Sequence, residues 1–109
     1  SVTFTGESIA VGAIRVYEID VPSGPAQTVE VETFSDAAAG TCTGIDTVVR
    51  LYDDAGAELG DDDDDGLSLC SLIDASDAFS TLQTGTHYLS VEEYLKDSAI
   101  TYDIVLDVP

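Results

Sequence analysis

Apolar and polar residues alternate along most of this chain, with the period of two that places successive side chains on opposite faces of a β-strand. The alternation is clearest at the carboxyl end, where Ile, Tyr, Ile, Leu and Val occupy every second position of residues 100–108. Similar patterns predict strands over residues 16–21, 29–32, 47–53, 57–60, 71–75 and 86–94. Helical spacing of apolar residues never persists beyond about one turn, so the chain is predicted to be all-β.

Turn sequences separate these strands and indicate the architecture. The segment Pro22-Ser23-Gly24-Pro25 cannot continue a strand, and Asp54-Ala55-Gly56 predicts a tight reversal that makes a hairpin of its two flanks. One more strand is expected near the amino terminus, over residues 2–5 or 8–11, and residues 76–79 suit a single helical turn. About seven or eight strands at this spacing are typical of an antiparallel β-sandwich.

Size and charge limit what such a sandwich can bind. The chain has 109 residues, which suits one domain over residues 1–109, and its 22 acidic against 3 basic residues give a formal net charge of −19. A surface this acidic repels phosphates, which excludes nucleic acids and anionic membranes as partners. Membrane insertion is not expected, because no apolar run approaches the roughly 18 residues that cross a bilayer.

Two irregular stretches, residues 35–45 and 60–71, interrupt the strands, and each holds one of the two cysteines. The spacing of Cys42 and Cys70 is not that of a CxxC redox or zinc motif, which favours a structural disulfide. The alternative is two reduced, buried thiols that act as small apolar fillers. A bridge here would stabilise the fold by about 3.6 kcal/mol on a chain-entropy estimate. It also predicts an oxidising, secreted setting, and the absence of Met fits removal of a signal peptide.

Residues 61–65 are consecutive aspartates followed by Gly66, and they are the strongest chemical signal in the sequence. Adjacent carboxylates repel by roughly 1 kcal/mol per close pair even in water, so an ordered loop needs full solvation or a cation. Calcium fits best because it takes about six to eight oxygen ligands with flexible geometry, whereas magnesium retains its waters and zinc prefers His and thiolate. The predicted ligands are Asp61, Asp62, Asp63, Asp64 and Asp65, with Asp46, Asp53 or Asp74 completing the shell from neighbouring strands.

The aspartate run matches only the front half of an EF-hand loop, D-x-D-x-D-G. The position of the bidentate Glu holds Leu72, and the flanks are predicted strands instead of helices. We therefore expect a calcium-binding loop between strands. The alternative is an exposed charge run that keeps the protein soluble and binds no particular ion.

An ordered series of motifs in the chain carries a family resemblance. It comprises DTVVRLYD at residues 46–53, CSLI at residues 70–73, GTHYLSV at residues 85–91 and the strand that contains Tyr102. From about Tyr17 to Val108, this series resembles the bacterial pre-peptidase carboxy-terminal domain. That family reads D-T-x-L-x-L-Y-D, a glycine turn, paired aspartates and G-T-Y-Y-x-x-V, and His87 stands where the family has Tyr.

The resemblance implies a jelly-roll-like antiparallel β-sandwich that is secreted as a non-catalytic module beside extracellular peptidases and other exported enzymes. Related collagen-binding modules of clostridial collagenases bind calcium near their amino-terminal segment. This chain has only Glu7, Glu18 and Asp20 there, so that particular site is not expected. Its tyrosines are spread over several predicted strands and form no aromatic strip of the kind that collagen binding needs.

Catalysis is not expected from this residue set. His87 is the only histidine and lies among ordinary strand residues, so a Ser or Cys nucleophile would have no positioned base. Glycine-rich phosphate loops are absent, and there is no Trp to form a sugar platform. Residue counts alone do not exclude a pair of catalytic carboxylates of the glycosidase type, because acidic residues are plentiful.

Two functions follow from these observations. The first is a secreted, calcium-stabilised accessory module that contacts an extracellular protein or a cell-surface partner. The second is a self-assembling subunit of an extracellular filament or surface layer, in which residues 1–8 extend from one copy and add a strand to the sheet edge of the next. A carbohydrate-binding module is a third class, and it lacks an identified aromatic platform.

Overall fold

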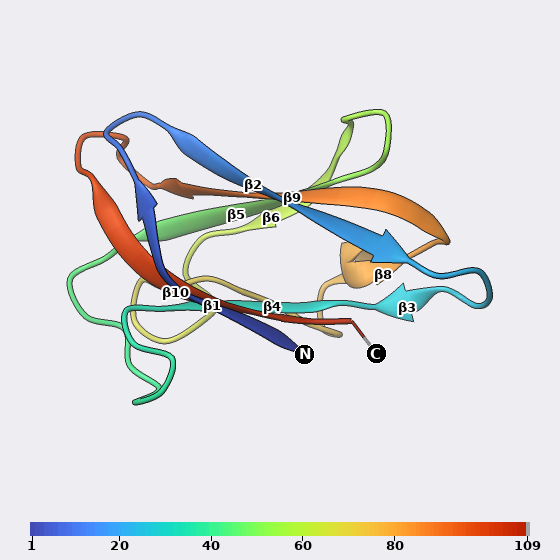
Figure 1. Ribbon diagram of the computed structural model, residues 1–109, viewed down its shortest axis with the longest axis horizontal. Helices are drawn as coiled ribbons and strands as arrows, with labels where there is room; N and C mark the ends of the chain where they lie inside the picture. The colour runs from blue at the N-terminus through green and yellow to red at the C-terminus, as the bar shows by residue number, and fades with distance from the viewer. Residues whose placement is uncertain (109) are drawn as a thin grey trace.

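The alternating segments form antiparallel strands in two stacked sheets, as Figure 1 shows for the computed structural model, which describes residues 1–108. The first sheet contains, in spatial order, β1 (Val2–Ile9), β10 (Ile100–Asp107), β4 (Glu30–Phe34) and β7 (Leu72–Ile73). The second contains β2 (Ile14–Val21), β9 (Gly85–Glu93), β5 (Thr47–Tyr52) and β6 (Glu58–Asp62). The predicted all-β antiparallel sandwich is therefore confirmed.

The connections between these strands are those of a jelly roll. Chain neighbours β1 and β2, β4 and β5, β6 and β7, and β9 and β10 lie in opposite sheets. A separate ribbon pairs β3 (Gln27–Thr28) with β8 (Thr81–Leu82), and the expected helical turn is the 3-10 element η1 (Ala78–Ser80). Within residues 1–108, no helix is long and apolar enough to cross a membrane.

The core consists of the inward-facing positions of the alternating strands. Tyr102 and Ile104 of β10 are fully buried between the sheets, as are Leu89 and Val91 of β9. Their neighbours in the apolar cluster include Tyr17, Ile19, Val29, Val31, Val49, Leu51, Ile73 and Leu82. Burying one such aliphatic side chain contributes roughly 1.5–3 kcal/mol, so the period of two in the sequence is what holds the sheets together.

The amino-terminal strand is one continuous element instead of either shorter segment expected from the sequence. Its register shifts between Phe4 and Glu7, where Gly6 has a φ of +64°. Glycine adopts this left-handed conformation without strain, which allows a bulge at that point. The Gly6 N–H donates to Asp103 Oδ1 of β10 at 2.9 Å. In this structure β1 pairs with β10 of its own chain.

A buried network of hydroxyl groups joins the two sheets. Thr33 of β4 and Thr47 of β5 contact each other through their Oγ1 atoms at 2.7 Å, and Ser71 Oγ lies 2.8 Å from Thr47 Oγ1. Ser71 Oγ also lies within hydrogen-bond distance of the carbonyl oxygens of Thr47 and Asp63, at 2.8 and 2.9 Å. The Ser71 N–H donates to Thr33 Oγ1 at 2.9 Å. The network therefore fixes the segment before β7 against both sheets.

We expect Ser71→Ala to lower the free energy of unfolding by about 1–3 kcal/mol, because it leaves buried polar atoms without partners. Urea denaturation followed by circular dichroism measures this change. Ser23→Ala is the matched control, since Ser23 is exposed in the turn after β2 and its loss should change stability by less than about 0.5 kcal/mol. Equal stability of the two variants would contradict a structural role for the network.

Candidate functional site

The predicted disulfide between Cys42 and Cys70 is present and joins the two irregular loops. Its Cα atoms lie 6.1 Å apart across a sequence separation of 28 residues, and Cys70 is fully buried. Cys42 precedes Asp46 in the loop that enters β5, and Cys70 follows the aspartate run in the loop that enters β7. The bridge therefore holds the two acidic loops to each other.

The structure divides the aspartate run between a strand and a turn, which corrects the prediction that residues 60–71 form one irregular loop. Asp61 and Asp62 belong to β6 and stand opposite Arg50 and Val49 of β5. The strand extends into the run because each of these two carboxylates has partners within the protein. Only the last three aspartates of the run lie in the turn that follows β6.

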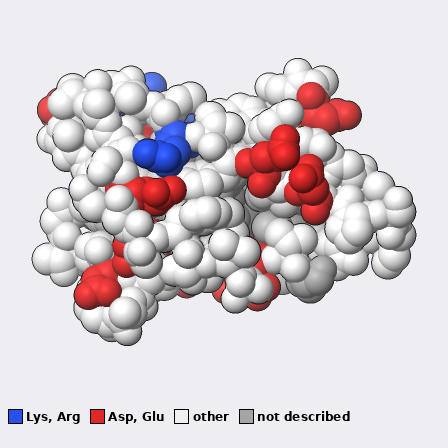
Figure 2. Space-filling view, in the orientation of Figure 1, with Lys and Arg blue, Asp and Glu red and all other residues white. Residues whose placement is uncertain are grey.

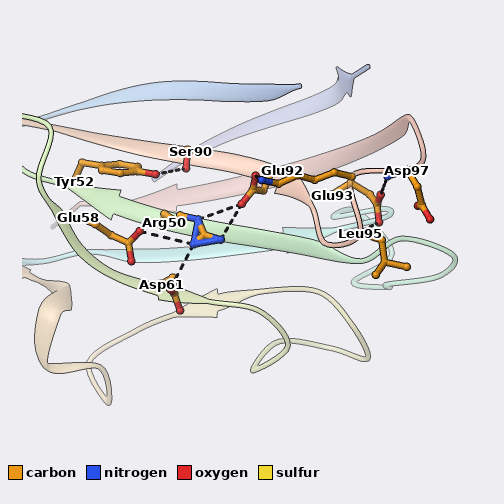
Figure 3. Close-up of polar contacts among 10 residues, drawn as sticks. Arg50, Tyr52, Glu58, Asp61, Ser90, Glu92, Glu93, Leu95 and Asp97 are labelled. Carbon is orange, nitrogen blue, oxygen red and sulfur yellow. Dashed lines mark hydrogen bonds and ion pairs between the residues drawn. The ribbon is translucent and has the colours of Figure 1, made fainter. Parts of the chain in front are cut away.

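The side chain of Asp61 belongs to an ion-pair cluster around Arg50 (Figure 3). Arg50 Nη1 lies 3.5 Å from Asp61 and 3.8 Å from Glu58, and Nη2 lies 3.0 Å from Glu92. Lys96 Nζ approaches the other oxygen of Glu92 at 3.2 Å. Asp61 is thus opposed by a positive charge of its own chain, although its own charge still contributes to raising the pKa of Asp63.

Asp62 is a buried carboxylate that links the turn after β6 to β7. Its side chain is buried, and Oδ2 accepts hydrogen bonds from the N–H groups of Leu72 at 2.8 Å and Asp65 at 3.2 Å. Burial raises the pKa of Asp62 to about 6, although these backbone hydrogen bonds act in the opposite direction. Through Oδ2 the carboxyl group ties the turn after β6 to the start of β7, so this oxygen already serves the protein.

Asp46 and Asp63 are the predicted ligands that the structure brings together. Burial raises the pKa of Asp46, and the charges of Asp63 and Glu93 raise it further. Burial and the charge of Asp64 raise the pKa of Asp63, while the neighbouring Asp46 side chain lowers it. Oδ1 of Asp46 is buried and has no hydrogen-bond partner within residues 1–108. Two carboxyl groups this close favour a shared proton or a bound cation.

A cavity of about 200 Å³ adjoins Asp46 and is also lined by Glu93. The Glu93 carboxylate accepts hydrogen bonds from the N–H groups of Leu95 and Asp97 at 3.1 and 2.9 Å (Figure 3). It also accepts one from the N–H group of Ser98 at 3.2 Å. Burial raises the pKa of Glu93, but these hydrogen bonds outweigh it and place the pKa below its usual range. Glu93 therefore keeps a negative charge beside the cavity.

Glu93 was not among the predicted site residues, although the sequence contains a signal for it. It continues the inward-facing positions of β9 after Leu89 and Val91, and it is itself buried. An acid in that register must be compensated inside the protein. The signal was missed because Tyr94 extended the predicted strand to residue 94, so Glu93 did not stand out as a residue at the end of a strand.

The structure does not bring Asp53 or Asp74 to Asp46. Asp46 precedes β5 and Asp53 follows it, so a strand of about 20 Å separates them. Asp53 Oδ1 accepts the N–H groups of two residues in the β5–β6 turn at 3.0 and 2.8 Å. Asp74 Oδ1 accepts the Ser76 hydroxyl at 2.6 Å, and hydrogen bonds from Ser76 lower its pKa. Each of these aspartates holds a turn of its own.

The acidic groups near Asp46 do not form a complete protein cage. Among residues 1–108, no three side chains of Asp, Glu, His or Cys lie together in a way that could hold a metal ion. A cation at Asp46 and Asp63 would therefore take further ligands from backbone carbonyls and water, which calcium accepts readily. Asp64 and Asp65 are exposed, and the charge of Asp64 acts on both Asp46 and Asp63.

In calcium-free buffer, we expect the contribution of Asp62 to the free energy of unfolding to fall as pH rises from about 4 to about 6. The pKa of an aspartate side chain in water is 3.8, whereas that of Asp62 in the fold is about 6, so the folded chain binds this proton more tightly. The resulting stabilisation is complete below the lower value and is lost as pH rises through the higher one. Asp46 and Asp63 shift in the same direction.

Urea denaturation of the wild type and of Asp62→Asn across this pH range measures the contribution. The Asn variant should show a weaker pH dependence, while the exposed control Asp54→Asn should follow the wild type. Identical pH profiles for all three proteins would show that Asp62 does not titrate with folding.

No protein-family model matches this chain, and no curated protein matches it. The jelly-roll sandwich is the fold that the pre-peptidase resemblance implies, but one fold serves many functions. Membership of that family therefore stays a prediction from the motifs.

Proposed function

We propose that this chain is a non-catalytic, secreted β-sandwich module that is stabilised by calcium and acts as an accessory or binding domain outside the cell. The observation that carries the proposal is the buried, unpartnered Oδ1 atom of Asp46 beside Asp63, among the described residues 1–108. Burying a carboxylate oxygen without a donor is costly, and a bound cation would remove that cost.

The chemistry of the donors favours calcium over other ions. Asp46, Asp63 and Asp64 offer hard carboxylate oxygens on two loops, and calcium tolerates the irregular geometry that loops present. The Cys42–Cys70 bridge restrains these loops, which lowers the ordering cost of bringing their carboxylates to one ion. Bound calcium would contribute charge neutralisation and would tie the entrance of β5 to the turn after β6.

The bridge and the surface charge support an extracellular setting. Disulfides persist in oxidising compartments and are rare in reducing ones. Acidic side chains occupy several separate places on the face shown in Figure 2, and basic side chains cover much less of it. With a formal net charge of −19, such a surface keeps the molecule soluble and attracts divalent cations.

The environment of the only histidine supports a non-catalytic role. His87 is buried at an inward-facing position of β9, and its Nδ1 lies 3.3 Å from the carbonyl oxygen of Gly85. No hydroxyl or thiol of residues 1–108 forms a hydrogen bond with its ring. An imidazole in this place serves the packing of the strand end and is not positioned as a general base.

Thermal melting in calcium and in EGTA tests the proposal. Calcium at about 100 times its dissociation constant would add about 2.7 kcal/mol of stability, which raises the Tm of a domain this size by roughly 10 °C or more. Asp46→Asn should abolish most of that rise, because it removes the charge of the buried carboxylate. Magnesium at the same concentration should give a much smaller rise, which separates binding from charge screening.

Asp54→Asn is the matched control, because it removes one exposed aspartate in the β5–β6 turn and leaves the Asp46 region intact. Its calcium response should equal that of the wild type. Coincident melting curves in calcium and EGTA at moderate ionic strength, or equal responses of the two variants, would overturn the calcium proposal.

A further inference from the structure

An apolar groove of about 280 Å³ opens between the two sheets at their β1 and β2 edges. Val2 and Phe4 of β1 line it and stay 54% and 39% exposed, although both are large apolar residues. The Phe4 ring lies 5.4 Å from the ring of Tyr17, which forms part of the opposite wall. The jelly roll therefore leaves this margin of its core uncovered.

The β2 wall of the groove presents backbone as well as side chains. Tyr17, Glu18, Ile19 and Asp20 all line the groove, although successive residues of a strand point to opposite faces of the sheet. Four consecutive residues can line one groove only when it runs along the edge of the strand. The groove therefore gives access to the peptide groups of β2.

The edge of β2 is regular and has no strand partner over this stretch. It ends the second sheet, and its pairing with β9 runs in unbroken register from Ile14 to Val21. Near the start of the strand, Arg15 Nη2 donates to the Ser8 carbonyl oxygen at 3.3 Å, so β1 lies close there. Residues 18–21 make no such bond to β1 within the described chain. A regular free edge is a template for another strand.

Charge decides which strand the edge would accept. Glu18 and Asp20 are exposed and flank the groove, and the chain as a whole has a formal net charge of −19. A second copy would place like charges against them, whereas Lys or Arg side chains of a different protein would neutralise them. The volume lies just below the roughly 300–1,000 Å³ of small-molecule sites, which favours a peptide side chain as the occupant.

We propose that this groove binds an extended, basic peptide segment of another protein, which adds as a strand to the edge of β2 at residues 17–20. One apolar side chain of the segment lies against Val2, Phe4 and Ile19. Basic side chains on either side of it pair with Glu18 and Asp20. Backbone hydrogen bonds supply affinity, and the alternation of apolar and basic residues supplies selectivity.

This inference rests on the proposed function in one respect: it names a partner for the binding module. The groove shares no lining residue with the cavity beside Asp46. Peptide titrations in calcium and in EGTA therefore separate the two proposals. Loss of the calcium-dependent Tm rise would leave peptide binding in place, and absence of peptide binding would leave the Tm rise in place.

The test uses the peptide acetyl-KVKVKVK-amide, titrated at physiological ionic strength by calorimetry and by ¹H–¹⁵N NMR. We expect saturable binding, with amide shifts and slowed hydrogen exchange at residues 17–20. The same peptide with alternate backbone nitrogens methylated should bind about tenfold more weakly, because it keeps the charges but loses strand hydrogen bonds. A peptide with Glu in place of Lys should not bind.

Two protein variants provide a matched comparison. Val2→Lys places a positive charge in the groove and should weaken binding about tenfold, whereas Ile14→Lys, at a site that is 56% exposed and outside the groove, should change it less than about twofold. The N-methylated peptide keeps the proposal testable on the wild type if Val2→Lys fails to fold. Equal binding of the methylated peptide, shifts scattered over the acidic surface, or self-association of the chain through β2 would each overturn it.

Discussion

The buried hydroxyl network of Thr33, Thr47 and Ser71 is the constraint on which the acidic end of this protein depends. It joins a strand of each sheet to the segment that follows the disulfide, and Ser71 Oγ lies within hydrogen-bond distance of the Asp63 carbonyl oxygen. Because these atoms are cut off from water, each must keep a protein partner, and only one relative placement of the sheets and the loop satisfies them all. The position of Asp63 beside Asp46 follows from that placement.

The distribution of positive charge explains why one part of the aspartate run differs from another. Arg50 and Lys96 both face Glu92, and Arg50 also reaches Asp61 on the outer face of the second sheet. Asp62, on the inner face, is compensated by backbone N–H groups. No Lys or Arg side chain forms a salt bridge with the turn aspartates within residues 1–108. Their compensation comes from water, protons or cations in solution, and the cation is the basis of the calcium proposal.

The scarcity of basic side chains also affects the groove between the edges of β1 and β2. Soluble β proteins protect free strand edges with charges, bulges or proline. Here β1 has the Gly6 bulge, while over residues 17–20 the regular edge of β2 has the acidic residues Glu18 and Asp20 beside it. Acidic protection repels other copies of a strongly acidic chain, but it does not repel a basic segment. The two proposed sites lie in different parts of the sandwich and depend on the same excess of negative charge.

The sequence by itself indicated most of the strands and the antiparallel sandwich, and it favoured the disulfide. Side-chain alternation is a local property, and two cysteines allow a single intramolecular pairing. The full length of β1 and the short β3–β8 ribbon were not predicted. Only the tertiary structure decided which acids meet. The opposition of Arg50 drew Asp61 into β6, and the length of β5 kept Asp53 away from Asp46. Glu93 lies beside the Asp46 cavity because its position in β9 faces inward. Its charge is stabilised there by three backbone N–H donors from the following loop. Contacts of this kind depend on strand register and on residues far apart in the chain, and a local pattern of polar and apolar positions does not contain them.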